Sequence, residues 1–309
     1  TYPEPDRVPG APHPREARAL FGQEAAERAF LGAWAAGKLH HAWLIRGPRG
    51  IGKATLAYRI ARARLAAEDG PGLFGPSGAP ESLDVDPEHP VARRIAAQGE
   101  PRLKTLTRPL ARKSGSQTLE KPYKLRGEIT VEVAQALERF VHLTAADGGW
   151  RVVVIDAADE LNRSAANKIL KTLEEPPPRT LMLLVAHAPA ALLPTIRSRC
   201  RTLDCATLGP EDLARALAAA GAETPDDPAA LAALSNGSPG EALRLLAEDG
   251  PALYARLAGL LGSAPGIDAV GLTRLAELAD GRTAGDRYAA IARLTTLLLQ
   301  RLARAGAGA

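Results

Sequence analysis

Cysteine is scarce in this sequence, because Cys200 and Cys205 are the only two among 309 residues. This scarcity excludes a secreted scaffold held together by disulfides and fits a reducing compartment. Two thiols with no histidine close by in the sequence cannot complete a four-ligand zinc site. We therefore expect two buried free thiols and no metal site.

Long apolar runs are also absent, and no stretch approaches the roughly 20 residues that a membrane-spanning helix needs. The sequence opens with a polar, proline-rich segment, residues 1–6, which is unlike a signal peptide. We expect a cytoplasmic chain with no membrane partner. The net charge of +4 and the isoelectric point near 9.2 permit contact with nucleic acid without requiring it.

The most informative segment that is present is a glycine-rich loop between an apolar run and a helical pattern. Its spacing follows the phosphate-binding consensus GxxxxGK[ST], in which backbone N–H groups cradle phosphates and the lysine reaches the outer ones. The candidate nucleotide-binding residues of this loop are Gly47, Gly50, Gly52, Lys53 and Thr55. Ala54 stands where the consensus has the Ser or Thr that ligates Mg²⁺, and Thr55 lies about 100° further round the helix.

A second motif lies on the run RVVVID, residues 151–156, whose β-branched residues are typical of a strand buried on both faces. We expect Asp156 at the carboxyl end of the sheet beside the glycine-rich loop, and it is a further candidate nucleotide-binding residue. Taken alone, the loop is also compatible with a strand–helix turn that binds nothing. The matching acidic strand favours descent from a nucleotide-binding protein.

Strand and helix patterns alternate up to about residue 206, and strand patterns are absent beyond Leu208. This alternation predicts an α/β fold with a doubly wound parallel sheet, followed by helical domains. We predict a disordered or loosely packed N-terminal arm at 1–18, an α/β domain at 19–206, a small three-helix domain at 207–248 and a helical C-terminal domain at 249–309.

Residues 101–126 form a basic segment with eight Lys or Arg and one acid, Glu120. We expect a strand at 103–106 and an exposed hairpin over the remainder. Its candidate DNA-binding residues are Arg112, Lys113, Lys121 and Lys124. A solvated loop is the interpretation that the sequence favours over a DNA contact, because Tyr123 is the only aromatic residue of the segment and no stacking series interleaves the charges.

Two further runs carry a family resemblance: NKILKTLEEPP at 167–177 and TIRSRC at 195–200. This pair resembles the bacterial clamp-loader AAA+ subunits, which read NALLKTLEEPP and then SRC, and the similarity extends over roughly residues 21–246. The resemblance implies a P-loop-type AAA+ fold for the α/β domain, a lid for the three-helix domain and an oligomerisation collar at 249–309. Collars of this family are usually larger, which leaves open whether this region is short or truncated.

Active members of this family carry an intact phosphate loop, a glutamate after the strand-ending aspartate and a sensor-two arginine. Those three positions hold Ala54, Ala157 and Gly240 here. The resemblance therefore implies a subunit without ATPase activity of its own and with no required cofactor, and it leaves open whether ATP or ADP still binds the loop. Related subunits often carry a four-cysteine zinc module, but residues 66–90 contain no cysteine, so we expect no zinc.

The resemblance assigns a catalytic role in trans to Arg199 of the SRC run, as an arginine finger in the ATP site of a neighbouring gamma or tau subunit. A guanidinium suits this task because it stays charged and is bidentate toward phosphate. Arg199 taken alone is also compatible with an ordinary arginine at a helix end, paired with a surface acid. His187 follows an expected strand, where active relatives keep a polar sensor, and a satisfied surface histidine is the alternative.

The implied partners are the gamma/tau and delta subunits and, through the complex, the sliding clamp and primed DNA. The implied function is that of a clamp-loader subunit of the DNA polymerase III holoenzyme. Two rivals remain. One is an active ATPase that uses Lys53 and Asp156 with Asp159 as a substitute base, and the other is a DNA-binding adaptor built on the basic segment.

Overall fold

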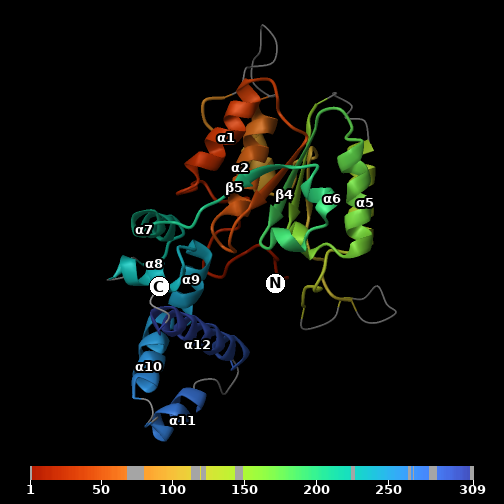
Figure 1. Cartoon of the computed structure of the whole chain (residues 1–309). Coiled ribbons are helices and arrows are strands. Elements are labelled where there is room, and N and C mark those ends of the chain that lie inside the picture. The colour runs from red at the N-terminus through yellow and green to blue at the C-terminus, as the bar shows by residue number, and fades with distance from the viewer. Residues whose placement is uncertain are drawn as a thin grey trace. The chain divides into compact units, whose positions relative to one another are not determined.

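The chain divides into two compact units in a computed structural model (Figure 1). The first unit comprises residues 1–7 and 12–207, and the second comprises residues 8–11 and 208–309. The structure describes residues 2–67, 80–112, 119, 123–142, 149–223, 227–263, 266, 268–277 and 284–306.

Five parallel strands form the sheet of the first unit, in the order β2-β3-β4-β1-β5. The strands are β1 (Ala42–Arg46), β2 (Leu103–Leu106), β3 (Arg151–Asp156), β4 (Thr180–Ala186) and β5 (Arg201–Asp204). Arg46 lies opposite Ala186, and Asp156 lies opposite Val185, so β1, β3 and β4 end at the same edge of the sheet. The predicted doubly wound parallel sheet is confirmed.

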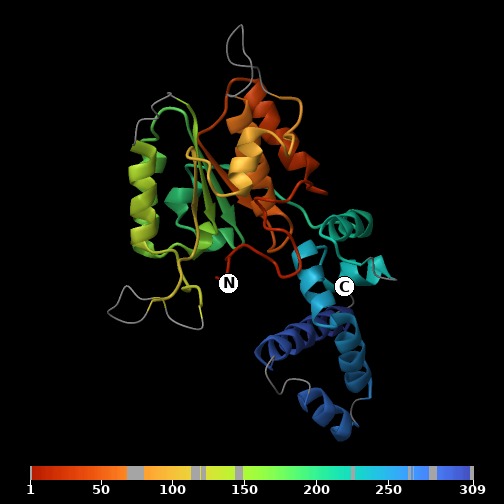
Figure 2. The ribbon, with the colours of Figure 1, turned by 180° about the vertical axis from the view of Figure 1, so that it is seen from behind.

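Helices cover both faces of this sheet, as Figures 1 and 2 show from opposite sides. One face carries α1 (Glu24–Ala35), α2 (Lys53–Ala66) and α3 (Pro90–Ala96). The other carries α4 (Val131–His142), α5 (Arg163–Glu174) and α6 (Pro194–Arg197). Single-turn helices η1 (Ala158–Glu160) and η2 (Pro189–Ala191) follow β3 and β4.

Alternate side chains of each central strand enter opposite cores, which explains their continuous apolar runs. In β1, Trp43 and Ile45 pack with α1 and α2, while Ala42 and Leu44 pack with α4 and α5. Every residue of β4 is buried. A strand with two buried faces has no polar period, so its length and its β-branched content are the signals that identify it.

Helix α3 was not predicted from the sequence. It begins at Pro90, and the side chain of His89 accepts a hydrogen bond from Val91 N at 3.2 Å. A proline in the first turn is a known start signal, because its fixed φ suits a helix and its missing N–H is not needed there. The segment is too short for an apolar period to stand out beside its glycine- and proline-rich surroundings.

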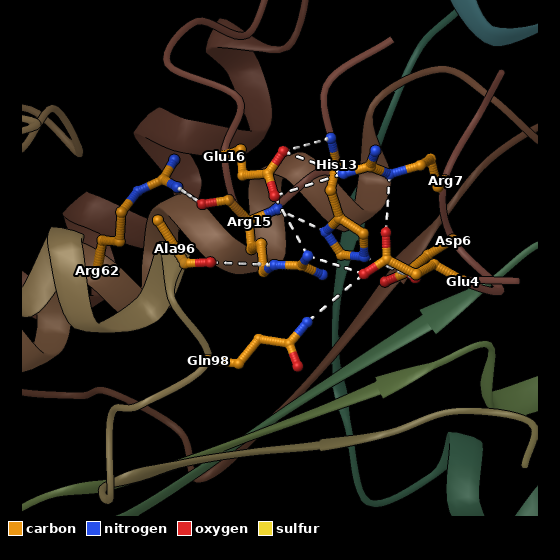
Figure 3. A network of polar contacts seen from close by, with 9 residues as sticks. All are labelled: Glu4, Asp6, Arg7, His13, Arg15, Glu16, Arg62, Ala96 and Gln98. Carbon is orange, nitrogen blue, oxygen red and sulfur yellow. Dashed lines mark hydrogen bonds and ion pairs between the residues drawn. The ribbon is translucent and has the colours of Figure 1, made fainter. Parts of the chain in front are cut away.

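The N-terminal arm is held by a network of polar contacts, which Figure 3 shows from close by. His13 has 2% of its surface exposed, and its Nε2 lies 2.9 Å from Asp6 Oδ1. Arg15 forms an ion pair with Glu4 at 2.8 Å and donates from Nε to Ala96 O at 3.2 Å. The expectation of a disordered or loosely packed arm is therefore wrong.

Two buried arginines of α2 hold the backbone of the arm. Arg62 donates to Arg15 O and to Ala17 O, each at 2.9 Å, and Arg59 donates to Arg18 O at 3.2 Å. Burial lowers the pKa of Arg62 to about 10. These partners lie more than 40 residues apart in the sequence. No local periodicity can reveal such contacts, which is why the arm seemed unstructured.

The second unit is helical throughout its described residues. Its helices are α7 (Pro210–Ala219), α8 (Pro228–Leu234), α9 (Pro239–Ala247), α10 (Gly250–Gly262), α11 (Ala269–Glu277) and α12 (Ala284–Gly306). Ser238 begins α9 by accepting a hydrogen bond from Glu241 N at 3.2 Å. Helix α12 continues to Gly306, the last residue that the structure describes.

We expect Asp6→Ala to lower the free energy of unfolding by about 1–3 kcal/mol, because it leaves the buried His13 ring without its partner. Urea denaturation of the full chain measures this loss. Glu88→Ala is the matched control, since its ion pair with Arg93 is 3.7 Å long and highly exposed. Equal effects of the two substitutions would contradict a structural role for the buried pair.

Candidate functional site

The glycine-rich loop keeps the shape of a phosphate loop between β1 and α2. Gly47 has φ +147°, and a Cβ there would lie 2.5 Å from Cys205 O. Gly52 precedes α2 with φ +97°, and a Cβ there would meet Leu20 Cδ1 at 2.6 Å. Backbone conformation therefore favours glycine at both positions, and at Gly47 the backbone of Cys205 also leaves no space for a side chain.

The side chain of Lys53 contacts the backbone of the glycine-rich loop. Its ammonium donates to Gly47 O at 2.8 Å and also to Pro48 O. Only 2% of its surface is exposed, and burial lowers its pKa to about 8 although Asp156 opposes the shift. The positive charge expected to face the outer phosphates is thus engaged by two backbone carbonyls.

Neither residue after Lys53 restores the expected magnesium ligand. Ala54 has no side-chain oxygen, and both Ala54 and Thr55 lie in the first turn of α2. Successive helix residues are about 100° apart, so Thr55 presents its hydroxyl in a different direction from residue 54. The residues present at this loop do not fit the usual Mg²⁺–nucleotide arrangement.

Asp156 lies at the carboxyl end of β3, next to the loop as expected. It is 6% exposed, and its pKa is raised to about 7. Burial is the main cause, the charge of Asp6 in the N-terminal arm adds to it, and Lys53 opposes it. The following residue, Ala157, is 2% exposed and offers no group that could polarise a water molecule. The sheet therefore brings Lys53 and Asp156 together, and the residue that follows Asp156 supplies no general base.

The carboxylate of Asp159 is hydrogen-bonded to backbone N–H groups. Its two carboxylate oxygens accept from His187 N at 2.9 Å and from Ala188 N at 3.0 Å, so it fixes the turn after β4. Burial, with the charges of Lys53 and Arg49, lowers the pKa of His187 to about 4. His187 is consequently neutral near pH 7 and half-buried, which corrects its alternative interpretation as a surface histidine.

Glu160 is a site residue that sequence reasoning missed. Its carboxylate pairs with Arg49 of the loop at 3.1 Å and with Arg108, beyond β2, at 2.9 Å. It thereby ties the glycine-rich loop to the start of the basic segment. The sequence shows only an acid four residues beyond the end of a strand, and a single acid of that kind is not a distinctive signal.

Arg199 lies just beyond α6 with 36% of its side chain exposed. Its guanidinium forms an ion pair with Glu174 at 2.8 Å and donates to Thr195 O at 3.0 Å. Glu174 ends α5 within the run that carries the resemblance. The two motifs that carry the resemblance therefore meet in space, through the arginine of one and the first glutamate of the other.

The basic segment forms the predicted hairpin as far as it is described. Ala111 N donates to Lys124 O at 2.7 Å, and Arg126 N donates to Pro109 O at 2.8 Å. Arg112 and Lys124 are exposed on its two limbs. The other two DNA-binding candidates, Lys113 and Lys121, lie outside the described residues.

The remaining predictions concern metal and thiols. Burial raises the pKa of both Cys200 and Cys205 to about 12, and both are free thiols. Cys205 is buried, whereas Cys200 is only partly buried. No group of three or more metal-ligating side chains occurs among the residues that the structure describes. Gly240, the sensor-two position, is buried in α9 and has no side chain to offer.

Known proteins are similar to this chain over the region that forms the parallel sheet. Residues 22–209 match the protein family described as DNA polymerase III, delta subunit. The chain belongs to that family. The predicted resemblance to bacterial clamp-loader subunits is confirmed, and within that group the chain is similar to delta-prime subunits.

Several delta-prime subunits are similar to this chain in sequence. DNA polymerase III subunit delta' of Pseudomonas aeruginosa is 38% identical over 213 residues, covering 66% of this chain and 55% of that protein. Subunit delta' of Escherichia coli is 33% identical over 221 residues, covering 71% and 58%. Subunit gamma of Buchnera aphidicola is 28% identical over 200 residues, covering 65% and 47%.

The chain spans about half the length of the curated relatives it matches. Its matched part contains the glycine-rich loop, the acidic strand and Arg199. Among the described residues, no helix is long and apolar enough to cross a bilayer.

We expect Asp156 to contribute a folding cost that grows as the pH rises from about 4 to about 7, because it holds its proton in the folded state when the unfolded chain has released it. Asp156→Asn removes this cost, so it should raise Tm most at pH 8 and least near pH 4. Thermal unfolding across this range measures the effect. Asp86→Asn, at an exposed loop position, is the control, and a gain that does not depend on pH would contradict the assignment.

Proposed function

We propose that this chain is a clamp-loader subunit that does not hydrolyse ATP and that acts on the ATP site of a neighbour. The observation that carries the proposal is the glycine-rich loop. It keeps its glycines and its lysine, but Lys53 binds Gly47 O and Pro48 O, and Ala54 offers no magnesium ligand. A loop of this kind preserves an architecture without supplying the electrostatics of phosphoryl transfer.

The alternative function, an active ATPase, requires a substitute general base, and Asp159 is the candidate in the sequence. Both carboxylate oxygens of Asp159 accept backbone N–H bonds, which hold the side chain in a fixed position. Using this carboxylate as a base would require breaking the turn after β4. The geometry therefore favours the non-hydrolytic role.

Arg199 supports the role in trans. Its side chain reaches solvent beside a short helix, and its pairing with Glu174 is also partly exposed. Exposed ion pairs contribute little stability, so the guanidinium can exchange Glu174 for a more highly charged phosphate. In the proposed complex, Arg199 enters the ATP site of a gamma or tau subunit and neutralises charge that develops on the phosphates. Glu174 holds the guanidinium near that surface until then.

The proposed partners are gamma/tau and delta subunits, and through the complex the sliding clamp and primed DNA. No cofactor or zinc ion is required by this proposal. The gamma and tau subunits are themselves similar to this chain, with 28% and 29% identity over aligned segments. Similar modules can repeat around a ring, in which each site is completed by a residue of the next subunit.

We expect Lys53→Ala to leave clamp loading by the reconstituted complex nearly unchanged, because Lys53 is engaged by its own loop. The rate of clamp loading on primed DNA is the measurement. A loss beyond about tenfold, comparable to ~1.4 kcal/mol, would show that the loop binds an essential nucleotide. Thermal unfolding of the variant separates this outcome from a folding defect.

We expect Arg199→Ala to reduce DNA-stimulated ATP hydrolysis by the complex without abolishing it. An arginine finger is worth about 10³–10⁵ in rate at the site it serves, while the other sites use other subunits. Arg199→Lys should restore little, since an ammonium cannot reproduce the planar fork of a guanidinium. Arg197→Ala, at an exposed position on the same turn, is the matched control. Wild-type hydrolysis by a normally assembled Arg199→Ala complex would refute the role in trans.

A further inference from the structure

Two distant segments of the first unit bring a pair of tyrosines together. Tyr2 of the N-terminal arm and Tyr123 of the basic hairpin have ring centroids 4.6 Å apart, with their planes inclined by 50°. Tyr2 is 54% exposed. The sequence showed Tyr123 as an isolated aromatic residue among basic ones. Folding supplies the second ring and so creates an exposed aromatic platform beside positive charge.

A cavity of about 700 Å³ adjoins this platform, and Tyr2 forms part of its wall. Its size lies within the range of about 300–1,000 Å³ that small-ligand sites occupy. The arm, α2 and the edge strand β2 line it with residues that include Tyr2, Pro3, Tyr58, Lys104, Thr105 and Thr107. Two strands, β3 and β4, separate β2 from β1 and its glycine-rich loop. Neither Asp156 nor any residue of the glycine-rich loop lines the cavity, so it is distinct from the candidate nucleotide site.

The cavity wall carries three acids and, apart from His13, two basic side chains, Arg15 and Lys104. Its acids are already paired: Glu4 with Arg15, Asp6 with His13, and Glu100 with Arg94 and Arg102.

Lys104 is the exception on this wall. Its ammonium makes no ion pair or hydrogen bond with the part of the chain that the structure describes, and the side chain is only half-buried. Lys124 and Arg126 are exposed on the limb of the hairpin that carries Tyr123. Positive charge therefore flanks the two rings on both the cavity side and the hairpin side.

We propose that this surface binds single-stranded nucleic acid. A base stacks on Tyr2 at the mouth of the cavity, with Tyr123 supporting that ring, and Lys104 binds the adjoining phosphate. Lys124 and Arg126 follow the backbone along the hairpin. Stacking on aromatic side chains beside a basic track is how proteins hold single strands, whose base faces are free, whereas the bases of a duplex are stacked on each other.

This proposal goes beyond the function proposed above, since it concerns the chain by itself and does not involve Arg199. Its test is the binding of a fluorescent oligo(dT) of about 15 nucleotides to the full chain, followed by anisotropy. Tyr2→Ala and Tyr123→Ala are each expected to weaken binding about tenfold, and Tyr123→Phe, which keeps the ring, to bind like the wild type. Tyr288→Ala is the matched control, because Tyr288 is 68% exposed on α12.

Lys104→Ala is expected to reduce the slope of log affinity against log salt by about 0.7, the value for one phosphate contact on a single strand. Lys38→Ala, at an exposed position after α1, should leave the slope unchanged.

Three results would overturn the proposal. The first is no binding of the oligonucleotide by the wild type at about 100 µM protein in low salt. The second is equal binding by the tyrosine variants and the Tyr288→Ala control, or equal competition by duplex DNA, which would leave a purely electrostatic surface. The third is competition by free dTMP as strong as that by the oligonucleotide, which would make the cavity a mononucleotide site. None of these results bears on hydrolysis by the complex, so the arginine-finger role is tested separately.

Discussion

The need to bury both faces of a parallel sheet organises the first unit. Strands β1, β3 and β4 have no polar face, so helices must cover both sides, and the connections must start and end at the edges of the sheet. The glycine-rich loop, Asp156 and the turn at His187 therefore meet at the carboxyl ends of the strands, where α/β folds bind ligands. The candidate site follows from how the core is packed.

At the carboxyl ends of these strands, the glycine-rich loop keeps the conformation of a phosphate loop, but its charged residues no longer suit phosphate binding. The backbone at Gly47 and Gly52 has positive φ, and a side chain at Gly47 would also meet the backbone of Cys205, so folding alone favours glycine at both positions. The charges are opposed by burial: it lowers the pKa of Lys53 to about 8 and raises that of Asp156 to about 7. Each group is thereby biased toward its neutral form. A site that binds magnesium and triphosphate needs the opposite, a fully charged lysine and a fully ionised aspartate.

The N-terminal arm connects this site with the basic hairpin that follows strand β2. Arg59 and Arg62 bind its backbone carbonyls, and the buried pair of Asp6 and His13 holds its first turn. Asp6 contributes to the raised pKa of Asp156, so the arm acts on the site through its charge. The same arm carries Tyr2 to the basic hairpin, where the two segments together form a surface that neither has alone.

Some of this could be determined from the sequence alone. Continuous β-branched runs predicted the parallel sheet, the GxxxxGK spacing predicted the loop, and the paired motifs ending at Arg199 predicted the family, because each is a local pattern with one dominant physical cause. Tertiary structure alone decided the rest: the commitment of Lys53 and Asp159 to backbone groups, the bridge through Glu160, the packed arm and the pairing of Tyr2 with Tyr123. These contacts join residues distant in the chain, and their energies depend on burial, which no local pattern of residues encodes.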